Sequence, residues 1–111
     1  MNTEAIWNVF YTEDANRDLD SIYDYIADVL LEPLTAINQV TRIMDIADTL
    51  DFMPFRHRLC DIEPWRSKGY RILPIDNYII YYLPNEAQKI VYVSRIIYVG
   101  RDAEKILSEA E

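Results

Sequence analysis

The sequence predicts an α+β domain in which a small antiparallel sheet packs against an N-terminal helical hairpin. Apolar side chains recur at helical spacing between residues 15 and 50, whereas residues 70–99 change to runs of β-branched and aromatic residues. A short strand-like run, residues 6–11, precedes the helices. The resulting order, β-α-α-β-β-β-α, is typical of a sheet with helices against one face. We expect residues 1–111 to form a single domain.

The N-terminal half is expected to form one strand and two antiparallel helices. The strand is followed by Thr12, which suits an N-cap because its hydroxyl can accept a hydrogen bond from an amide one turn further on. Apolar residues at helical spacing then continue to Leu31. Pro33 suits the first turn of a second helix, where its missing N–H would be unpaired in any case. Residues 51–54, Asp-Phe-Met-Pro, end that second helix.

A β-hairpin is expected at the start of the C-terminal half. Strand-like residues 70–75 and 78–83 flank Asp76 and Asn77, and both of these residue types tolerate the left-handed backbone of a two-residue turn. Pro74 has no N–H to donate, so it should lie at an edge position of the sheet or at a bulge.

The remaining elements follow a second turn at residues 84–88. Residues 89–99 form the longest strand-like run, and residues 101–107 suit a short closing helix.

Charge is distributed unevenly along the chain, whose net charge is −8. Residues 1–51 contain eleven acids and two bases, whereas residues 52–111 contain eight acids and nine bases. Five of the bases lie between Arg56 and Arg71. The acidic total argues against non-specific nucleic-acid binding, but the local basic stretch could attract phosphate.

Several other classes of protein are excluded by composition. A single cysteine, Cys60, excludes an intrachain disulfide, and Cys60 with His57 offers no zinc-binding spacing. We therefore expect no metal and no cofactor. The N-terminus lacks signal-peptide features, and the apolar runs fall short of the roughly 20 residues that span a bilayer. These features predict a cytoplasmic protein with no membrane partner.

Four segments of the chain carry a family resemblance. They are residues 23–27 of the first helix, the connector 52–57, the Gly-Tyr-Arg element 69–71 and the final strand with its exit, 94–102. Their order and spacing resemble the RelE/ParE superfamily of toxins from type II toxin–antitoxin systems, which are also known as plasmid stabilisation systems. The resemblance covers nearly the whole chain. It implies a small twisted antiparallel sheet with an N-terminal helical hairpin, in agreement with the order derived from the residues.

The resemblance implies a growth-inhibiting toxin and leaves three mechanisms open. RelE-like members are ribosome-dependent mRNA interferases that cut mRNA in the ribosomal A site, whereas ParE-like members inhibit DNA gyrase and have no nuclease chemistry. A third alternative is a degenerate member that keeps only partner binding. Active members of both kinds are neutralised by a cognate antitoxin, and the complex typically represses its own operon.

A nuclease site needs a group that removes the 2′ proton, cations for the phosphorane and a proton donor for the leaving oxygen. The resemblance assigns Arg71 to the phosphate and Tyr98 to a base or a proton, and Arg101, just past the last strand, is a candidate second cation. We expect Arg71 and Arg101 to meet at least one of His57, Arg56 or Tyr98 on one concave surface. Arg71 should leave the sheet on the face away from the helices.

The chain also departs from the nuclease pattern. Two lysines of the RelE type fall opposite Ile62 and Pro64, and a late histidine of other nucleases falls opposite Ile97. None of these three residues can do acid–base work. Glu63 and His57 could replace the missing base and acid, provided that the fold brings them within reach of the phosphate-binding arginine.

The expected partner is an antitoxin segment laid along the domain as a helix or strand. The family's antitoxins are often acidic where they cover a basic surface, so the stretch from Arg56 to Arg71, with Arg101 beside it, is the natural counterpart. The acidic N-terminal half favours basic residues on the side of the partner that faces it.

Overall fold

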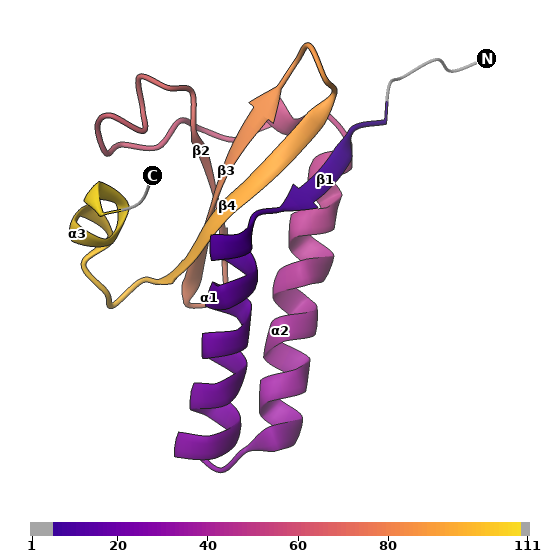
Figure 1. Cartoon of the computed structure of the whole chain (residues 1–111). Helices are drawn as coiled ribbons and strands as arrows, with labels where there is room; N and C mark the ends of the chain where they lie inside the picture. The colour runs from indigo at the N-terminus through magenta and orange to yellow at the C-terminus, as the bar shows by residue number, and fades with distance from the viewer. Residues whose placement is uncertain (1–5, 110–111) are drawn as a thin grey trace.

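Four strands form an open sheet with a long helical hairpin against one face (Figure 1). The computed structural model describes residues 6–109. The spatial order of the strands is β1-β4-β3-β2. Strands β2, β3 and β4 are antiparallel, as predicted, whereas β1 runs parallel to β4 and makes the sheet mixed. The strands are β1 (Asn8–Tyr11), β2 (Arg71–Ile75), β3 (Tyr78–Asn85) and β4 (Ile90–Tyr98).

The helices occupy the predicted places in the chain, the α+β class is confirmed, and the observed order is compatible with the predicted one. The first predicted helix is α-helical to Asp24 and continues as one π-helical segment. None of the helices within residues 6–109 is long and apolar enough to cross a bilayer. The helical elements are α1 (Glu13–Asp24), the π-helix η1 (Tyr25–Val29), α2 (Pro33–Asp48), the 3₁₀ turns η2 (Thr49–Asp51) and η3 (Pro54–Arg56), and α3 (Ala103–Ser108).

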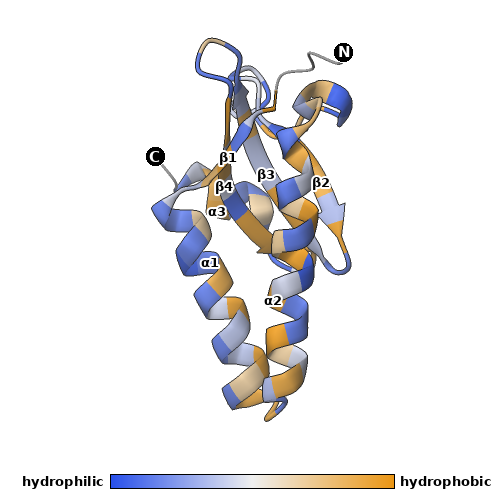
Figure 2. Ribbon diagram, turned by 90° about the vertical axis from the view of Figure 1, so that its right-hand side faces the viewer, coloured by the Kyte–Doolittle hydropathy of each residue, from blue (hydrophilic) through white to orange (hydrophobic). Residues whose placement is uncertain are grey.

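The main core lies between the helical hairpin and the sheet. Figure 2 shows hydrophobic segments along α2 and on the strands, which are the surfaces that this core brings together. The lower part of the hairpin extends beyond the sheet (Figure 1). The buried side chains of this core are Trp7, Ala15, Leu19, Ile43, Ala47, Leu50, Leu73, Ile75, Ile80, Tyr82, Val91, Val93 and Ile96.

A second, smaller core covers the opposite face of the sheet, where the sequence led us to expect no helix. The loop between η3 and β2 folds over this face together with α3. Trp65, from the loop, is buried, and its indole N–H donates to the carbonyl of Leu107 in α3 at 3.3 Å. A buried indole needs such an acceptor, and the bond fastens the short C-terminal helix to the loop. The buried members of this core are Cys60, Trp65, Ile72, Tyr81, Ile97 and Leu107.

Strand β4 contains a bulge that α1 stabilises. Tyr82 lies opposite Val93 while Tyr81 lies opposite Arg95, so one extra residue, Ser94, interrupts the pairing. The hydroxyl of Thr12, which caps α1 as predicted, donates to the Ser94 carbonyl at 3.1 Å. Side chains of α1 thus satisfy backbone groups that the bulge removes from the ladder.

The carboxylate of Asp18 completes this connection between α1 and the bulge. It accepts hydrogen bonds from Nε and Nη2 of Arg95 at 2.8 and 3.0 Å, and from the amide of Ile96 at 2.8 Å. The side chains of Asp18 and Arg95 are only 14% and 19% exposed. Their charges are therefore largely removed from water and depend on each other.

The turn between β2 and β3 is the predicted one. Asp76 has a φ of 54°, which an aspartate tolerates better than most residues, and Pro74 lies on the edge strand as expected. Arg42 and Gln39 of α2 donate to the Asp76 carboxylate at 2.9 and 3.0 Å. These two bonds hold the pKa of Asp76 at about 2. They also fix the turn to the hairpin.

Replacing Asp18 with alanine should destabilise the fold strongly, because it leaves the largely buried guanidinium of Arg95 and the amide of Ile96 without their acceptor. We expect the free energy of unfolding to fall by about 3 kcal/mol, as measured by urea denaturation. The matched control is Asp14→Ala, which removes an exposed ion pair with Arg17 and should cost less than about 0.5 kcal/mol. Equal losses in the two variants would contradict this account of the α1–β4 contact.

Acid should weaken the fold through Asp76. The pKa of this carboxyl is lowered from 3.8 to about 2 in the folded state, so its stabilising effect is complete above pH 4 and is lost as the pH falls towards 2. The variant Asp76→Asn tolerates the same backbone but cannot titrate. Its unfolding free energy should therefore change less than that of the wild type between pH 4 and pH 2 in urea titrations. Parallel pH curves for both proteins would rule out this contribution.

Candidate functional site

The four predicted site residues lie in two separate places. Arg71, at the start of β2, pairs with Tyr82, whereas Tyr98, at the end of β4, pairs with Tyr78. Tyr82 and Tyr78 are four residues apart on β3, which corresponds to about 13 Å along a strand. Arg71 and His57 are therefore at one end of the sheet, and Tyr98 and Arg101 are at the other. The single cluster expected from the sequence is not formed.

Arg71 points towards the opposite face from the one predicted. Residues 71, 73 and 75 share a face because side chains alternate along a strand, and Leu73 and Ile75 belong to the core under the helices. The prediction assumed that helices fill all of this face. In fact the end of the face near Arg71 is covered by the connector between α2 and β2.

The contacts of Arg71 fix that connector to the sheet. Its Nη1 donates to the carbonyls of Phe55 and His57 at 3.2 and 2.5 Å, and its guanidinium lies 5.2 Å from the centre of the Phe55 ring. The neighbouring hydroxyl of Tyr82 donates to the carbonyl of Pro54 at 2.7 Å. These bonds engage Nη1 of the guanidinium that the resemblance assigns to phosphate, whereas its Nε is buried without a partner among residues 6–109.

His57 is poorly suited to the role of general acid in this setting. Its ring packs edge-on against Tyr82, with centroids 6.3 Å apart, and its Nε2 is buried without a partner among residues 6–109. Burial lowers the pKa of His57, and the positive charges of Arg56 and Arg71 lower it further. The imidazole is therefore neutral near pH 7 and lacks the additional proton that such an acid would donate.

Glu63, the predicted substitute base, belongs to the loop that covers the other face of the sheet. Its carboxylate is exposed and accepts from the amide of Ser67 at 3.0 Å. The fold thus separates Glu63 from the cluster around Arg71.

The rest of the basic stretch is also largely paired within the domain. Arg58 and Arg66 both lie near Asp61, at 3.1 and 3.8 Å. Arg56 donates to backbone carbonyls at the end of α2 and in η2. Within residues 6–109, only Lys68 of this stretch has no side-chain hydrogen bond or ion pair. The stretch therefore offers far less free positive charge than its composition suggests.

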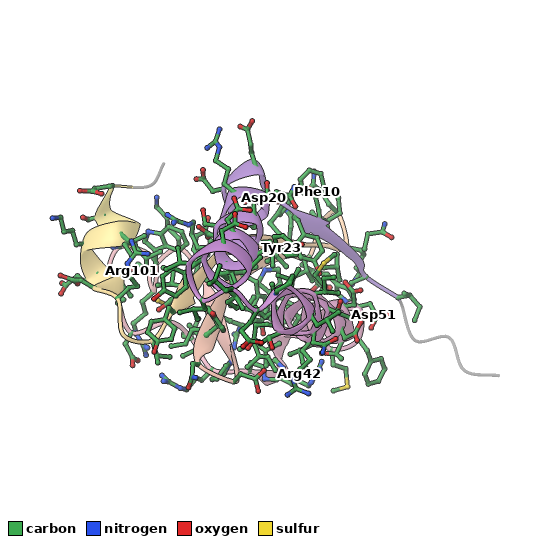
Figure 3. All side chains as sticks on the ribbon, turned by 90° about the horizontal axis from the view of Figure 1, so that it is seen from below. Phe10, Asp20, Tyr23, Arg42, Asp51 and Arg101 are labelled. Atoms are coloured by element: carbon green, nitrogen blue, oxygen red, sulfur yellow. The ribbon has the colours of Figure 1, made fainter. Side chains whose placement is uncertain are left out.

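Tyr98 and Arg101 line an open groove of about 910 Å³, which we call the hairpin groove. One wall comes from α1 and η1, the floor from the end of β4, and the other wall from the β2–β3 turn and α3. Figure 3 shows Arg101 beside α3, across the molecule from Asp51. The principal apolar and aromatic lining residues are Ile22, Tyr25, Ile26, Tyr78, Ile96 and Ile106.

The hairpin groove combines aromatic walls with one unpaired cation. Tyr78 and Tyr98 pack edge-on with centroids 5.6 Å apart, and burial raises the pKa of Tyr78. Arg95 also lines the groove, but Asp18 neutralises it. Arg101 is exposed and has no side-chain hydrogen bond or ion pair within the described residues. This arrangement suits a protein segment with apolar anchors and a carboxylate.

Sequence reasoning missed the wall that η1 contributes. Tyr25 and Leu30 line the groove and are 56% and 50% exposed. The available signal was an excess of apolar residues beyond the single stripe that a helix needs to face its own core. No group of three or more His, Cys, Asp or Glu side chains within residues 6–109 is arranged as metal ligands.

The fold and the groove define a small α+β domain with an open, partly aromatic groove beside its helical hairpin. Residues 9–103 match the family model described as the ParE toxin of the type II toxin–antitoxin system parDE. The chain therefore belongs to the ParE toxin family.

Two solved structures share this fold. One is a chromosomal ParDE system from P. aeruginosa, with a TM-score of 0.72, 23% identity, and coverage of 86% of this chain and 98% of that chain. The other is the toxin–antitoxin complex RelBE2 from Mycobacterium tuberculosis, with a TM-score of 0.64, 16% identity, and coverage of 88% and 97%. Comparison with curated protein sequences returns no match.

Replacing Arg71 should act on stability. In Arg71→Ala the carbonyls of Phe55 and His57 lose a charged donor, so we expect a loss of about 2 kcal/mol in the free energy of unfolding. Arg71→Lys should recover little of it, because an ammonium group lacks the planar guanidinium that lies over the Phe55 ring. Urea denaturation measures the loss, and limited proteolysis should show faster cleavage in residues 52–58. Unchanged stability in both variants would restore Arg71 as a free phosphate ligand.

Proposed function

We propose that this chain is the toxin of a type II toxin–antitoxin pair and that it inhibits growth by binding DNA gyrase. The observation that supports binding over RNA cleavage is the engagement of Arg71 with the connector carbonyls. For Nη1 of Arg71 to bind a phosphate, it would have to give up bonds that hold the connector to the sheet.

The placement of the acid–base groups supports the same proposal. Cleavage through the 2′-hydroxyl needs a base and an acid on either side of one phosphate. Glu63 and His57 lie on elements that pack against opposite faces of the sheet, and Tyr98 is at the far end. Tyr98 and Arg101 together supply one phenol and one cation. A nuclease site built on these two residues would therefore have no general base.

We also propose that the antitoxin occupies the hairpin groove. An amphipathic antitoxin segment would place its apolar side chains between η1 and β4 and a carboxylate at Arg101. The two structural neighbours were both determined as toxin–antitoxin systems, which supports a partner of this kind. The partially paired basic stretch contributes less to this interface than Arg101 does.

The proposed target can be tested directly with purified components. The chain should inhibit supercoiling of relaxed plasmid by DNA gyrase, and it should leave mRNA intact in an in vitro translation reaction read by primer extension. Cleavage of mRNA at codon boundaries, with normal supercoiling, would instead establish the interferase mechanism and assign Tyr98 and Arg101 to it. The absence of both activities, together with no growth arrest on expression, would indicate a degenerate family member.

The variant Arg101→Glu should weaken antitoxin binding, because it places a negative charge against the carboxylate that the groove accommodates. We expect at least a tenfold increase in Kd, or about 1.4 kcal/mol, for the protein encoded by the neighbouring reading frame. The control Arg17→Glu makes the same charge change at an exposed site on the first turns of α1, and it should leave Kd nearly unchanged. Calorimetry on both variants measures the difference. Equal effects would place the antitoxin elsewhere.

A further inference from the structure

Residues 52–58 of the connector, which we call the latch segment, are held to the sheet by polar contacts more than by apolar burial. Pro54 is the one buried residue of this segment, whereas Phe52, Met53 and Phe55 are 41%, 53% and 45% exposed. Met53 also has a φ of 48°, a left-handed conformation that a residue with a Cβ adopts reluctantly. A segment with so few buried apolar contacts opens at a lower free energy than the core does.

The polar contacts that close the latch segment come from two guanidinium groups and one phenol. Arg71 reaches in from β2 and donates to two carbonyls of the segment, while Tyr82 of β3 donates to a third at 2.7 Å. Arg56, within the segment, donates to backbone carbonyls of the segment itself and of η2. Neither guanidinium forms an ion pair with a carboxylate among residues 6–109. Positive charges without direct counterions therefore hold the segment closed.

His57 lies among these positive charges. Its ring packs edge-on against Tyr82, and its Nε2 is buried without a partner among residues 6–109. The charges that act on its imidazole are Arg56 in the same segment and Arg71 on β2, and the pKa of the Tyr82 phenol is raised by burial, which keeps that group neutral. A proton on Nε2 would add a third positive charge and an N–H that has no acceptor.

We propose that His57 makes the connector pH-sensitive: a proton on its imidazole releases residues 52–58 from the sheet. In the closed segment the imidazolium would lie beside Arg56 and Arg71, whereas in the open segment water solvates it. Release also frees the guanidinium of Arg71 from the two carbonyls that it binds.

Proton linkage gives the direction of this effect. Burial and the two guanidinium groups lower the pKa of His57 below 6.5 in the closed segment, so the open segment binds a proton more tightly. The stability of the closed segment is therefore complete above pH 6.5. It is lost progressively as the pH falls from 6.5 towards the pKa of the closed state.

Proton NMR can follow this group directly, because the chain contains one histidine. The imidazole should titrate below pH 6.5, and the amides within residues 52–58 should exchange faster with solvent as it gains its proton. After correction for the intrinsic exchange rate, opening should increase by up to about tenfold per pH unit below 6.5. The amides of β3 and β4 should stay more protected throughout, because the segment opens while the sheet remains folded.

Two variants isolate the imidazole. His57→Phe keeps an aromatic edge against Tyr82 but cannot bind a proton, so the corrected exchange within residues 52–58 should be equal at pH 7 and pH 5.5. His57→Gln also lacks a titrating group and should behave in the same way, which separates the loss of the proton site from the packing of phenylalanine. The matched control, Asn38→His, adds an imidazole at an exposed position on α2 and should keep the wild-type pH dependence.

Three results would each overturn the inference. The first is an imidazole in the wild type that titrates at or above pH 6.5. The second is a pH dependence of exchange that is the same in the wild type and in both His57 variants. The third is exchange within residues 52–58 that is as slow as in β3 and β4, since opening would then require unfolding of the whole domain. These measurements use neither gyrase nor an antitoxin, so their outcome is independent of the proposed function.

Discussion

The fold depends on the contact between α1 and the bulged strand β4. Asp18 binds Arg95 and the amide of Ile96, while Thr12 caps the helix and binds the bulge carbonyl. The bulge alone would leave backbone groups without partners, and the two charges alone would be costly to bury. The bulge and the buried Asp18–Arg95 pair therefore stabilise each other, and together they set the position of the hairpin on the sheet.

This anchoring leaves the two ends of the hairpin in different environments. Near Thr12 the helices cover the sheet and build the main core, whereas near Leu31 they extend beyond it. The hairpin groove lies between η1 and the end of β4. Among the residues that line the groove is Arg101, whose side chain has no hydrogen bond or ion pair within residues 6–109.

Most of the fold was predictable because local signals agree with the tertiary structure. Thr12, Pro33 and the Asp76–Asn77 turn each act over a few residues, so neighbouring sequence is enough to place them. The candidate site was predicted less well. Tyr98 and Arg101 do share one surface, but Arg71 and His57 do not join them, because strand pairing places these pairs at opposite ends of the sheet.

The sequence by itself determined the class of fold, the order of elements and the uneven charge, since these follow from periodicity, capping and composition. Only the tertiary structure decided which charges are free. The arginines look alike in the sequence, yet Arg71 and Arg56 of the basic stretch bind backbone carbonyls, while Arg101 has no side-chain partner within residues 6–109. The tertiary structure also decided that β1 joins the sheet in parallel and that a second core forms over the other face. In each of these cases the contacting residues are far apart in the chain. Local sequence patterns therefore do not predict which of them will be in contact.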